Sequence, residues 1–276
     1  HSVDWRPLFG MAAYCACARG GQCMSTKTSA VIVEARQLSI QHGARTVLAP
    51  FDWTVRAGEH WVILGANGTG KTSVLHALLG IDAKMTSQVF LAGSPLNTLS
   101  AREQAALRVW VPQHYDEPFT LTVVQALTSV AQEADDACID RVLTCYGLHH
   151  LAQHWVHTLS GGERQRLTWA MSAARTTALT QLWLLDEPLA AQDLSWQAVL
   201  LKQLHDAPCA VVAAVHDLNQ VSQFATHVLL IQKNATGAAE VIAAGLIDEV
   251  MQAEFLSAAY GVDLHLVPDL AWWQVR

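Results

Sequence analysis

The stretch of this chain that most restricts its fold is "ILGANGTGKTSV", residues 63–74. Gly65, Gly70, Lys71 and Thr72 satisfy the phosphate-loop pattern G-x-x-x-x-G-K-[ST]. An apolar run precedes the pattern, and apolar residues at helical spacing follow it. Glycines let backbone N–H groups approach phosphate oxygens, and a helix N-terminus favours anions. The stretch therefore predicts a strand, a loop and a helix that together bind a phosphate-bearing ligand.

Two polar residues of this loop have distinct predicted roles. The Lys71 ammonium is a point charge suited to the β- and γ-phosphates, and the Thr72 hydroxyl is a ligand suited to Mg²⁺. The alternative is a glycine-rich turn without a ligand. The lysine and both flanking elements argue against that alternative.

The acidic partner expected for such a loop is found in "LWLLDEP", where a buried strand ends. Asp186 would hold Mg²⁺, directly or through water, and Glu187 would polarise the attacking water. Phosphoryl transfer needs little covalent help from the protein, because positioning and charge stabilisation dominate. The alternative is a structural turn at the end of the strand.

The rest of the chain predicts an α/β fold. Residues 31–40 read as one strand, and residues 49–65 as two strands around a turn at Ala57-Gly58. Ser100 begins a capping box that leads through a helix into a strand at "RVWV". Continuous apolar runs such as "LWLLD" and "AVVAAV" favour a parallel sheet that is covered on both faces.

Between residues 114 and 158 the pattern changes to helical periodicity without strands. The predicted helices are residues 122–132, 137–148 and 149–155. Strands and helices then alternate again. The predicted elements are a strand in 179–188, a helix in 195–206, a strand in 208–217, a helix in 219–227 and a hairpin formed by 227–234 and 240–245.

A second anion-binding segment is predicted at "TLSGGERQRL", residues 158–167. Ser160, Gly161 and Gly162 form a short polar turn in front of a helix that carries arginines. A helix N-terminus of this kind favours an anion. If the two anion sites lie far apart within one subunit, one nucleotide cannot touch both. Two subunits arranged head to tail could hold the nucleotide between them.

Taken together, these motifs resemble those of a known family. "GANGTGKT", "VPQH", "LSGGERQR", "LWLLDEP" and "AAVHDLN" occur in the order and spacing of the ATP-binding subunits of ABC transporters, and the resemblance runs from about residue 31 to 266. It implies a P-loop NTPase (RecA-like) α/β core with a mostly parallel sheet, an N-terminal antiparallel β part and a helical subdomain insertion. We expect residues 1–29 to be a poorly structured leader, residues 30–276 a single ABC ATPase domain, and residues 114–158, approximately, the helical subdomain.

The resemblance also implies ATP and Mg²⁺ as cofactors and assigns the site residues. Gln113 would be the Q-loop glutamine, which contacts Mg²⁺ or water, and His216 would be the switch histidine that reaches the γ-phosphate. Asp186 and Glu187 would be the Mg²⁺ residue and the general base, and Thr72 would be a further metal ligand. The phosphate loop would consist of Gly65, Ala66, Asn67, Gly68, Thr69, Gly70, Lys71 and Thr72.

In the same resemblance, part of the site comes from a second copy of the chain. Ser160, Gly161, Gly162 and Glu163 would face the other subunit's γ-phosphate, and Asp193 would lie in the D-loop at the dimer seam. The implied assembly is a homodimer of cassettes with the nucleotide between them.

The sequence departs from the family pattern at two places. The family stacks an aromatic residue on adenine, and the alignment of "LSIQHGARTVL" puts His42 there. An imidazole stacks less extensively, so we expect a weaker adenine contact. The family's D-loop usually reads S-A-L-D, whereas this chain has Ala191 and Gln192 before Asp193. The phosphate loop, Asp186 and Glu187 all match the family pattern, which implies that the chain hydrolyses ATP.

Within the family, "RVWVPQH" and "AEFLSAAYGVDLHLV" resemble the importers of iron–siderophore, haem and cobalamin. "FDWTVRAGEHWVILG" is also similar to cassettes of molybdenum systems. The alternatives are therefore another ABC system, such as a molybdate-type importer or an exporter, and a soluble ABC ATPase. A P-loop kinase would not need "LSGGERQR".

Partners and location follow from the resemblance and from composition. No apolar run approaches ~18 residues, so the membrane-spanning part would lie on other chains. We expect integral membrane permease subunits as partners, a periplasmic or surface substrate-binding protein as an indirect partner, and a peripheral position on the cytoplasmic face of the inner membrane. The net charge of −7 argues against nucleic acid as a partner.

Two clusters of possible metal ligands have simpler interpretations. Cys15, Cys17 and Cys23 lack a second ligand pair, and a chain of 276 residues with six cysteines favours reduced thiols in the cytosol. His149, His150, His154 and His157 include three residues at i, i+4 and i+7, which would share one helical face. We interpret that face as solvated.

One further surface is predicted beside the Q-loop. Tyr115, Pro118 and Phe119 follow Gln113 and could contact the permease, although internal packing explains them equally well. The ten tryptophans, Trp53, Trp61 and Trp183 among them, are expected to pack in the core.

Overall fold

The computed structural model describes residues 30–43, 45–81, 88–114, 120–131, 134–234, 237–267 and 272–275. The expected leader, the predicted permease contacts at Tyr115, Pro118 and Phe119, and the side chain of His42 lie outside the described residues.

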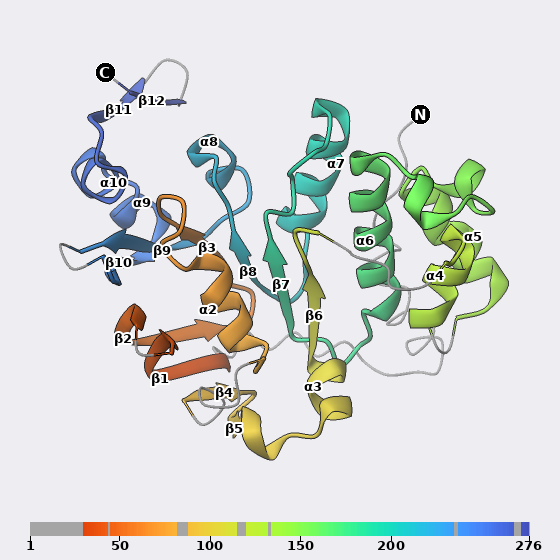
Figure 1. The fold of residues 1–276 in the computed structure, drawn as a ribbon, viewed down its shortest axis with the longest axis horizontal. Helices are drawn as coiled ribbons and strands as arrows, with labels where there is room; N and C mark the ends of the chain where they lie inside the picture. Colours follow the sequence, from red (N-terminus) through yellow and green to blue (C-terminus); the bar gives the residue numbers. More distant parts are fainter. Residues whose placement is uncertain are drawn as a thin grey trace.

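The elements follow one another along the chain as drawn in Figure 1. They are β1 (Val31–His42), β2 (Arg45–Arg56), β3 (His60–Leu64), α2 (Lys71–Leu78), β4 (Val89–Leu91), β5 (Ser94–Pro95), η1 (Leu96–Thr98), α3 (Ala101–Leu107), β6 (Arg108–Val111), α4 (Val123–Val130), α5 (Asp136–Cys145), η2 (His149–Leu151), η3 (Val156–Thr158), α6 (Gly161–Arg175), β7 (Leu182–Asp186), α7 (Leu194–His205), β8 (Ala210–Ala214), α8 (Leu218–Val221), β9 (His227–Lys233), β10 (Ala239–Leu246), α9 (Ile247–Val250), α10 (Ala253–Tyr260), β11 (Leu264–Val267) and β12 (Trp272–Val275).

Within the described residues, a ten-stranded sheet has the order β5-β4-β1-β2-β10-β9-β3-β8-β7-β6. The pairs β9–β3, β3–β8, β8–β7 and β7–β6 are all parallel. The β1–β2, β1–β4 and β4–β5 pairs are antiparallel and lie towards the other edge of the sheet. The structure therefore confirms the predicted α/β fold, with its parallel core and N-terminal antiparallel part.

The parallel strands are buried on both faces, which explains their continuous apolar runs. In β3, Val62 and Leu64 pack into one core cluster, which also takes in residues of α4, α5, α6 and α7. Ile63 points to the other face, where it packs in a second cluster with residues of α2. Each such side chain stabilises the fold by roughly 1.5–3 kcal/mol relative to exposure. Helix α2 and helix α6 therefore cover opposite faces of the sheet.

Most predicted elements are present. The turn between β2 and β3 includes Ala57 and Gly58, and β9 and β10 form the predicted antiparallel hairpin. The capping box at the start of α3 is complete, because Ser100 accepts from the backbone of Glu103 and the Glu103 side chain accepts in return. Trp53 and Trp183 are buried, as expected for core residues, whereas Trp155 has 45% of its surface exposed and does not fit that expectation.

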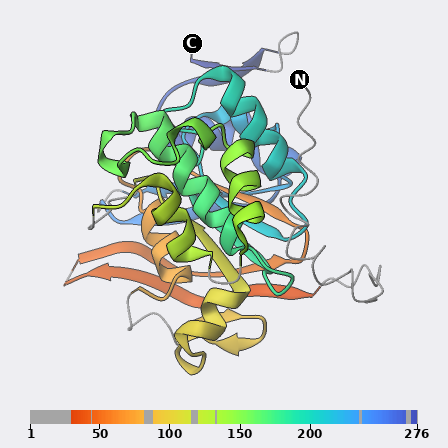
Figure 2. The ribbon, with the colours of Figure 1, turned by 90° about the vertical axis from the view of Figure 1, so that its right-hand side faces the viewer.

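Helices α4, α5 and α6 group together on one side of the sheet (Figure 2). Helices α4 and α5 correspond to two of the helices predicted between residues 114 and 158. In the described part of the chain, no helix combines the length and the apolar character needed to cross a membrane.

The helix predicted over residues 149–155 is wrong. The structure has the short 3-10 turns η2 and η3 instead, so His150, His154 and His157 do not share a helical face. The reason is that backbone bonds run to another segment, with Val123 N donating to His154 O at 2.9 Å. All three histidines are exposed, as expected for solvated side chains.

Candidate functional site

The loop between β3 and α2 has the backbone that a phosphate loop requires. Gly65 has a φ of 152°, and a Cβ there would lie 2.4 Å from the carbonyl oxygen of Ile231. Only glycine fits at such a distance. Gly70 is the N-cap of α2 in the left-handed region, and no side chain caps that helix. Gly70 therefore gives the N–H groups of the first turn no side-chain acceptor.

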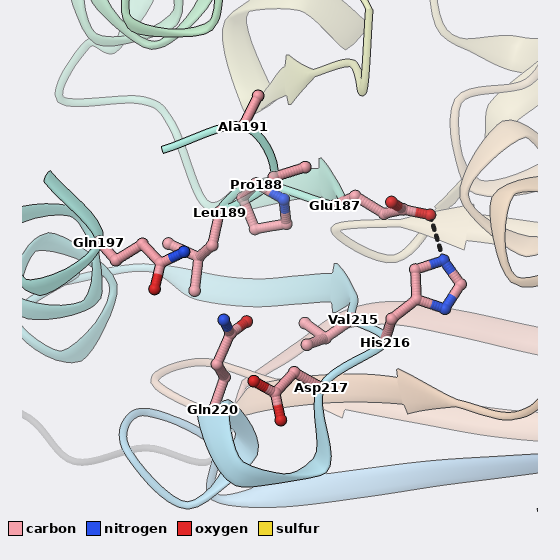
Figure 3. Close-up of a pocket in the computed structure, with 10 residues that line it drawn as sticks. Glu187, Pro188, Leu189, Ala191, Gln197, Val215, His216, Asp217 and Gln220 are labelled. Carbon is pink, nitrogen blue, oxygen red and sulfur yellow. Dashed lines mark hydrogen bonds and ion pairs between the residues drawn. The ribbon is translucent and has the colours of Figure 1, made fainter. Parts of the chain in front are cut away.

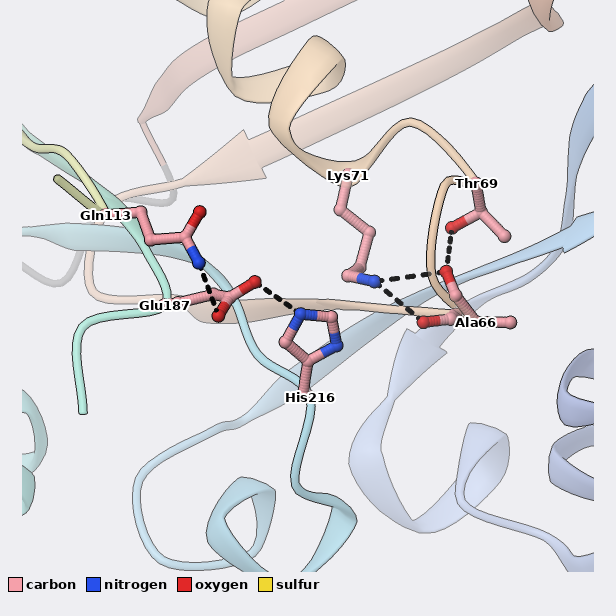
Figure 4. A network of polar contacts seen from close by, with 7 residues as sticks. Ala66, Thr69, Lys71, Gln113, Glu187 and His216 are labelled. Atoms are coloured by element: carbon pink, nitrogen blue, oxygen red, sulfur yellow. Dashed lines mark hydrogen bonds and ion pairs between the residues drawn. The ribbon is translucent and has the colours of Figure 1, made fainter. Parts of the chain in front are cut away.

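The Lys71 side chain folds back over this loop (Figure 4). Its Nζ donates to the carbonyl of Gly65 at 2.8 Å and to that of Ala66 at 3.2 Å. Burial lowers the pKa of Lys71 from its ordinary value, while the charges of Glu187 and Asp186 act in the opposite direction. Among the described residues, the hydrogen-bond acceptors of this buried cation are backbone carbonyls.

Asp186, at the end of β7, is buried with 3% of its surface exposed. Burial raises the pKa of Asp186, and the charge of Glu187 raises it further, whereas a hydrogen bond from the Thr72 side chain lowers it. Oδ1 of Asp186 is buried and has no hydrogen-bond partner among the described residues. A buried carboxylate oxygen without a partner, next to a hydroxyl, is a donor set that fits Mg²⁺.

Glu187 lies between two polar side chains from other strands (Figure 4). Its Oε2 accepts from Nε2 of Gln113 at 2.9 Å. Its Oε1 is in hydrogen-bonding contact with Nε2 of His216. The backbone of Glu187 is in the left-handed region, with a φ of 46°. For a residue other than glycine this conformation costs of the order of 1–3 kcal/mol and is found mainly at functional sites.

The parallel sheet explains why these residues meet. Gly65 follows β3, Gln113 follows β6, Asp186 ends β7 and His216 follows β8. These four strands are neighbours in the order β3-β8-β7-β6. Because the carboxyl ends of parallel strands lie at one edge, the structure brings these sequence-predicted residues together there. Ligands of open α/β sheets bind at this edge.

A small cavity of about 200 Å³ adjoins this edge (Figure 3). Glu187 and His216 lie on one side of it, and Gln197 and Asp217 also line it. The cavity shares its walls with the loop that follows β7. It therefore belongs to the surroundings of the Glu187 carboxylate.

The second predicted anion site is not brought to the phosphate loop. Ser160 is the N-cap of α6, and the helix begins with a complete capping box in which the Glu163 carboxylate accepts from the Ser160 hydroxyl at 2.7 Å. Since α6 and α2 cover opposite faces of the sheet, Ser160, Gly161 and Gly162 lie away from Lys71.

Asp193, the predicted D-loop residue, is the N-cap of α7. It accepts from the backbone of Trp196 at 2.9 Å and from the hydroxyl of Ser195 at 2.6 Å. These hydrogen bonds lower the pKa of Asp193. The side chain is thus already used to begin a helix.

Sequence reasoning missed two contacts at the site. Lys233, at the end of β9, donates from Nζ to the Asn67 carbonyl at 3.4 Å. Gln192 donates from Nε2 to the Gly162 carbonyl at 3.1 Å. The only sequence signal for the second contact was the departure of Gln192 from the family pattern. The first contact depends on the strand order, which puts β9 beside β3.

The sequence of the chain is similar to those of known proteins. The sequence model of the ABC transporter family matches residues 48–190. The hemin import ATP-binding protein HmuV of Bordetella avium is 31% identical over 251 residues, which cover 86% of this chain and 94% of that protein. The ferric enterobactin transport ATP-binding protein FepC of Escherichia coli is 29% identical, covering 84% of this chain and 88% of that protein.

Solved structures support the fold. A metal-chelate type ABC transporter in an inward-facing conformation aligns with a TM-score of 0.67 at 24% identity, covering 85% of this chain and 90% of that one. The cbiO1 subunit of the cbiONQ transporter from Clostridium perfringens aligns with a TM-score of 0.62 at 22% identity, covering 82% and 92%.

Proposed function

The chain belongs to the ABC transporter family, and from that premise we propose that it is the motor subunit of an importer that carries a metal chelate. Its activity is ATP hydrolysis. The relatives that support the cargo class are named for the import of hemin and of ferric enterobactin. The cargo proposed here is correspondingly an iron–siderophore or haem, with cobalamin as a third member of the class.

One observation carries the proposal. The carboxylate of Glu187 is held between Gln113 and His216, at the edge where the buried Lys71 and Asp186 also lie. A general base must be oriented towards the proton that it accepts. Contacts on both carboxylate oxygens restrict the side chain to one orientation.

The proposed reaction uses these groups as follows. Glu187 accepts a proton from water as the water oxygen bonds to the γ-phosphorus, and the bond between that phosphorus and the β-phosphate oxygen breaks. Lys71 exchanges its carbonyl contacts for phosphate oxygens and neutralises the developing charge. Mg²⁺, when bound, supplies further positive charge on the phosphates. Asp186, Thr72 and Gln113 would hold it, and His216 would contact the γ-phosphate.

We further propose a homodimer in which each nucleotide lies between two copies of the chain. The Ser160–Gly162 turn is on the face of the sheet opposite to α2, so a nucleotide on the phosphate loop of one copy could reach this turn only on another copy. Asp193 would lie at the seam between them. His42 remains our candidate for the adenine contact.

The membrane part of the importer would be supplied by other chains. We propose that integral membrane permease subunits bind this chain on the cytoplasmic face of the inner membrane, and that a substrate-binding protein delivers cargo to the permease. The segment after Gln113 is the proposed contact, and the helices between residues 114 and 158 form the proposed helical subdomain.

The test combines ATPase assays with transport. The chain is reconstituted with its permease in proteoliposomes, and uptake of labelled haem, ferric siderophore and cobalamin is measured. We expect ATP-dependent uptake of one of them and loss of both uptake and hydrolysis in Glu187→Gln. Uptake of molybdate, or outward transport, would replace the proposed cargo class. Unchanged hydrolysis in Glu187→Gln would remove the proposed base.

A further inference from the structure

Gln192 lies in the short loop between β7 and α7 and is buried, with 8% of its surface exposed. Its Nε2 donates to the carbonyl of Gly162, in the first turn of α6, at 3.1 Å. Its own carbonyl accepts from Nε2 of Gln197 at 3.2 Å. The residue therefore connects three segments: its own loop, the first turn of α6 and the first turn of α7.

The backbone of this loop also rests on α6. Ala191 is in the left-handed region with a φ of 58°. A Cβ at Gly162 would lie 3.0 Å from the carbonyl oxygen of Ala191 and 4 Å or less from Nε2 of Gln192. The loop and the helix are thus in direct contact, and a side chain at position 162 would push them apart.

The second polar atom of the Gln192 side chain has no such contact. Oε1 is buried and lacks a hydrogen-bond partner among the described residues. A buried polar atom without a partner is costly, and an apolar side chain of similar size would avoid that cost. Retaining an amide here is consistent with a function for the bond that its other end makes.

We propose that Gln192 is a positioning residue that fixes the loop carrying Asp193 against the Ser160–Gly162 turn. This inference rests on the proposed function, in which both segments of one copy approach the nucleotide held by the other copy. The hydrogen bond keeps the two segments in register, so that they meet the partner's nucleotide as one unit. It acts on closure of the dimer and not on the first binding of ATP.

The experiment compares Gln192→Leu and Gln192→Glu with the parent. Leucine removes the hydrogen bond with little change in size, and an ionised glutamate keeps the shape but cannot donate to the Gly162 carbonyl. Dimer formation is followed by light scattering in a Glu187→Gln background as Mg-ATP is titrated. Binding of a fluorescent ATP analogue to the monomer and the melting temperature are measured in parallel.

We expect both variants to raise the ATP concentration for half-maximal dimerisation about fivefold, the factor that one neutral hydrogen bond supplies. In chains that keep Glu187, the two Gln192 variants should have a kcat for ATP hydrolysis that is lower than the parent's by about the same factor. Analogue binding by the monomer should stay as in the parent for both variants. The melting temperature should stay so for Gln192→Leu, which also removes the unpartnered Oε1, and should fall for Gln192→Glu, which puts a carboxylate at a buried position. Gln223→Leu, the same substitution at an exposed glutamine in the turn that follows α8, is the matched control and should change none of these values.

Three outcomes would overturn the inference. Equal dimerisation midpoints and kcat values for parent and Gln192→Leu would show that the bond positions nothing. A Gln192→Glu protein as active as the parent would show that the donor is not needed. Weakened analogue binding by the monomer would indicate a general structural defect. If the Glu187→Gln parent itself fails to dimerise at saturating Mg-ATP, the proposed dimer fails together with the inference.

Discussion

Helices α2 and α6 both begin at a proposed phosphate contact, but their first turns differ. Helix α2 begins after Gly70, in the left-handed region, and no side chain caps it. Helix α6 begins at Ser160, whose hydroxyl accepts from the backbone of Glu163 while the Glu163 carboxylate accepts in return. One N-terminus is open to an anion, and the other already has a carboxylate beside it.

The difference indicates an order of events. An open N-terminus with the buried cation Lys71 can bind a nucleotide in a single copy of the chain. At α6 a phosphate must compete with the Glu163 carboxylate for Ser160. In the proposed dimer, a second copy that brings its nucleotide close would make that exchange favourable. We therefore expect binding at α2 first and contact at α6 on closure of the dimer.

The largest expected effect comes from removing the cation at α2. Lys71→Ala should lower the rate of ATP hydrolysis by roughly 10²–10³-fold, because such a charge stabilises the transferring phosphoryl group. ATP binding to the monomer should weaken as well. Hydrolysis is measured by phosphate release and binding by fluorescence of an ATP analogue. Lys202→Ala, at an exposed lysine of α7, is the control. Normal analogue binding by Lys71→Ala would contradict the comparison.

A smaller effect is expected at α6. Ser160→Ala should lower hydrolysis by about 10- to 100-fold, the factor for one hydrogen bond to a charged group, while analogue binding by the monomer stays normal. The loss of the cap should also cost about 1 kcal/mol of stability. Hydrolysis, analogue binding and urea unfolding separate these contributions. Weaker binding by the monomer would mean that α6 contacts the nucleotide without a partner.

Asp186→Asn tests whether the buried carboxylate of Asp186, which lies near the start of α2, lowers the stability of the ligand-free fold. Burial raises the pKa of Asp186, so its ionised form destabilises the ligand-free fold once the pH exceeds the ordinary aspartate pKa. At pH 7 the variant should melt about 2 °C higher without ligand. The stabilisation that Mg-ATP gives the parent should be lost. Calorimetry measures the melting temperature of parent and variant with and without Mg-ATP. A lower melting temperature for the ligand-free variant than for the ligand-free parent would contradict the proposed destabilisation by ionised Asp186.

The smallest effect concerns the capping box of α6. Hydrogen bonds from Ser160 lower the pKa of Glu163. The capping contribution of the charged form is therefore present above the ordinary carboxyl pKa and is lost as the pH falls through the lowered value. Glu163→Gln keeps an acceptor at this position without a charge. Its melting temperature at pH 7 should differ from the parent's by about 1 °C. The further decrease in melting temperature on acidification should be smaller in the variant than in the parent. Melting curves of both proteins from pH 7 to pH 3 measure this decrease. An equal decrease in melting temperature in parent and variant would contradict the prediction.

The parts of the fold that could be predicted from sequence are those that local chemistry determines. The phosphate loop, the capping box at Ser100 and the buried runs of β7 and β8 depend on short-range patterns. The meeting of Gln113, Glu187 and His216 was reached only through the resemblance to a family, since their contact depends on which strands are neighbours.

The parts that failed depend on contacts distant in sequence. Residues 149–155 have helical periodicity, but the backbone around His154 bonds to the start of α4. Helix α10, which packs against β9, and the hairpin of β11 and β12 were not predicted. The contact of Gln192 with Gly162 joins the loop before α7 to the first turn of α6, and only the unusual D-loop residue indicated it.

The left-handed backbone of Glu187 has a consequence for how this chain can change over generations. Glycine or asparagine would relieve the strain at that position, so a chain selected for heat resistance alone would drift towards them. Under the proposed mechanism, such a drift would leave a folded chain that binds ATP but does not hydrolyse it. Stabilised variants obtained from random libraries should therefore be sequenced at codon 187 before their rates of ATP hydrolysis are compared with that of the parent.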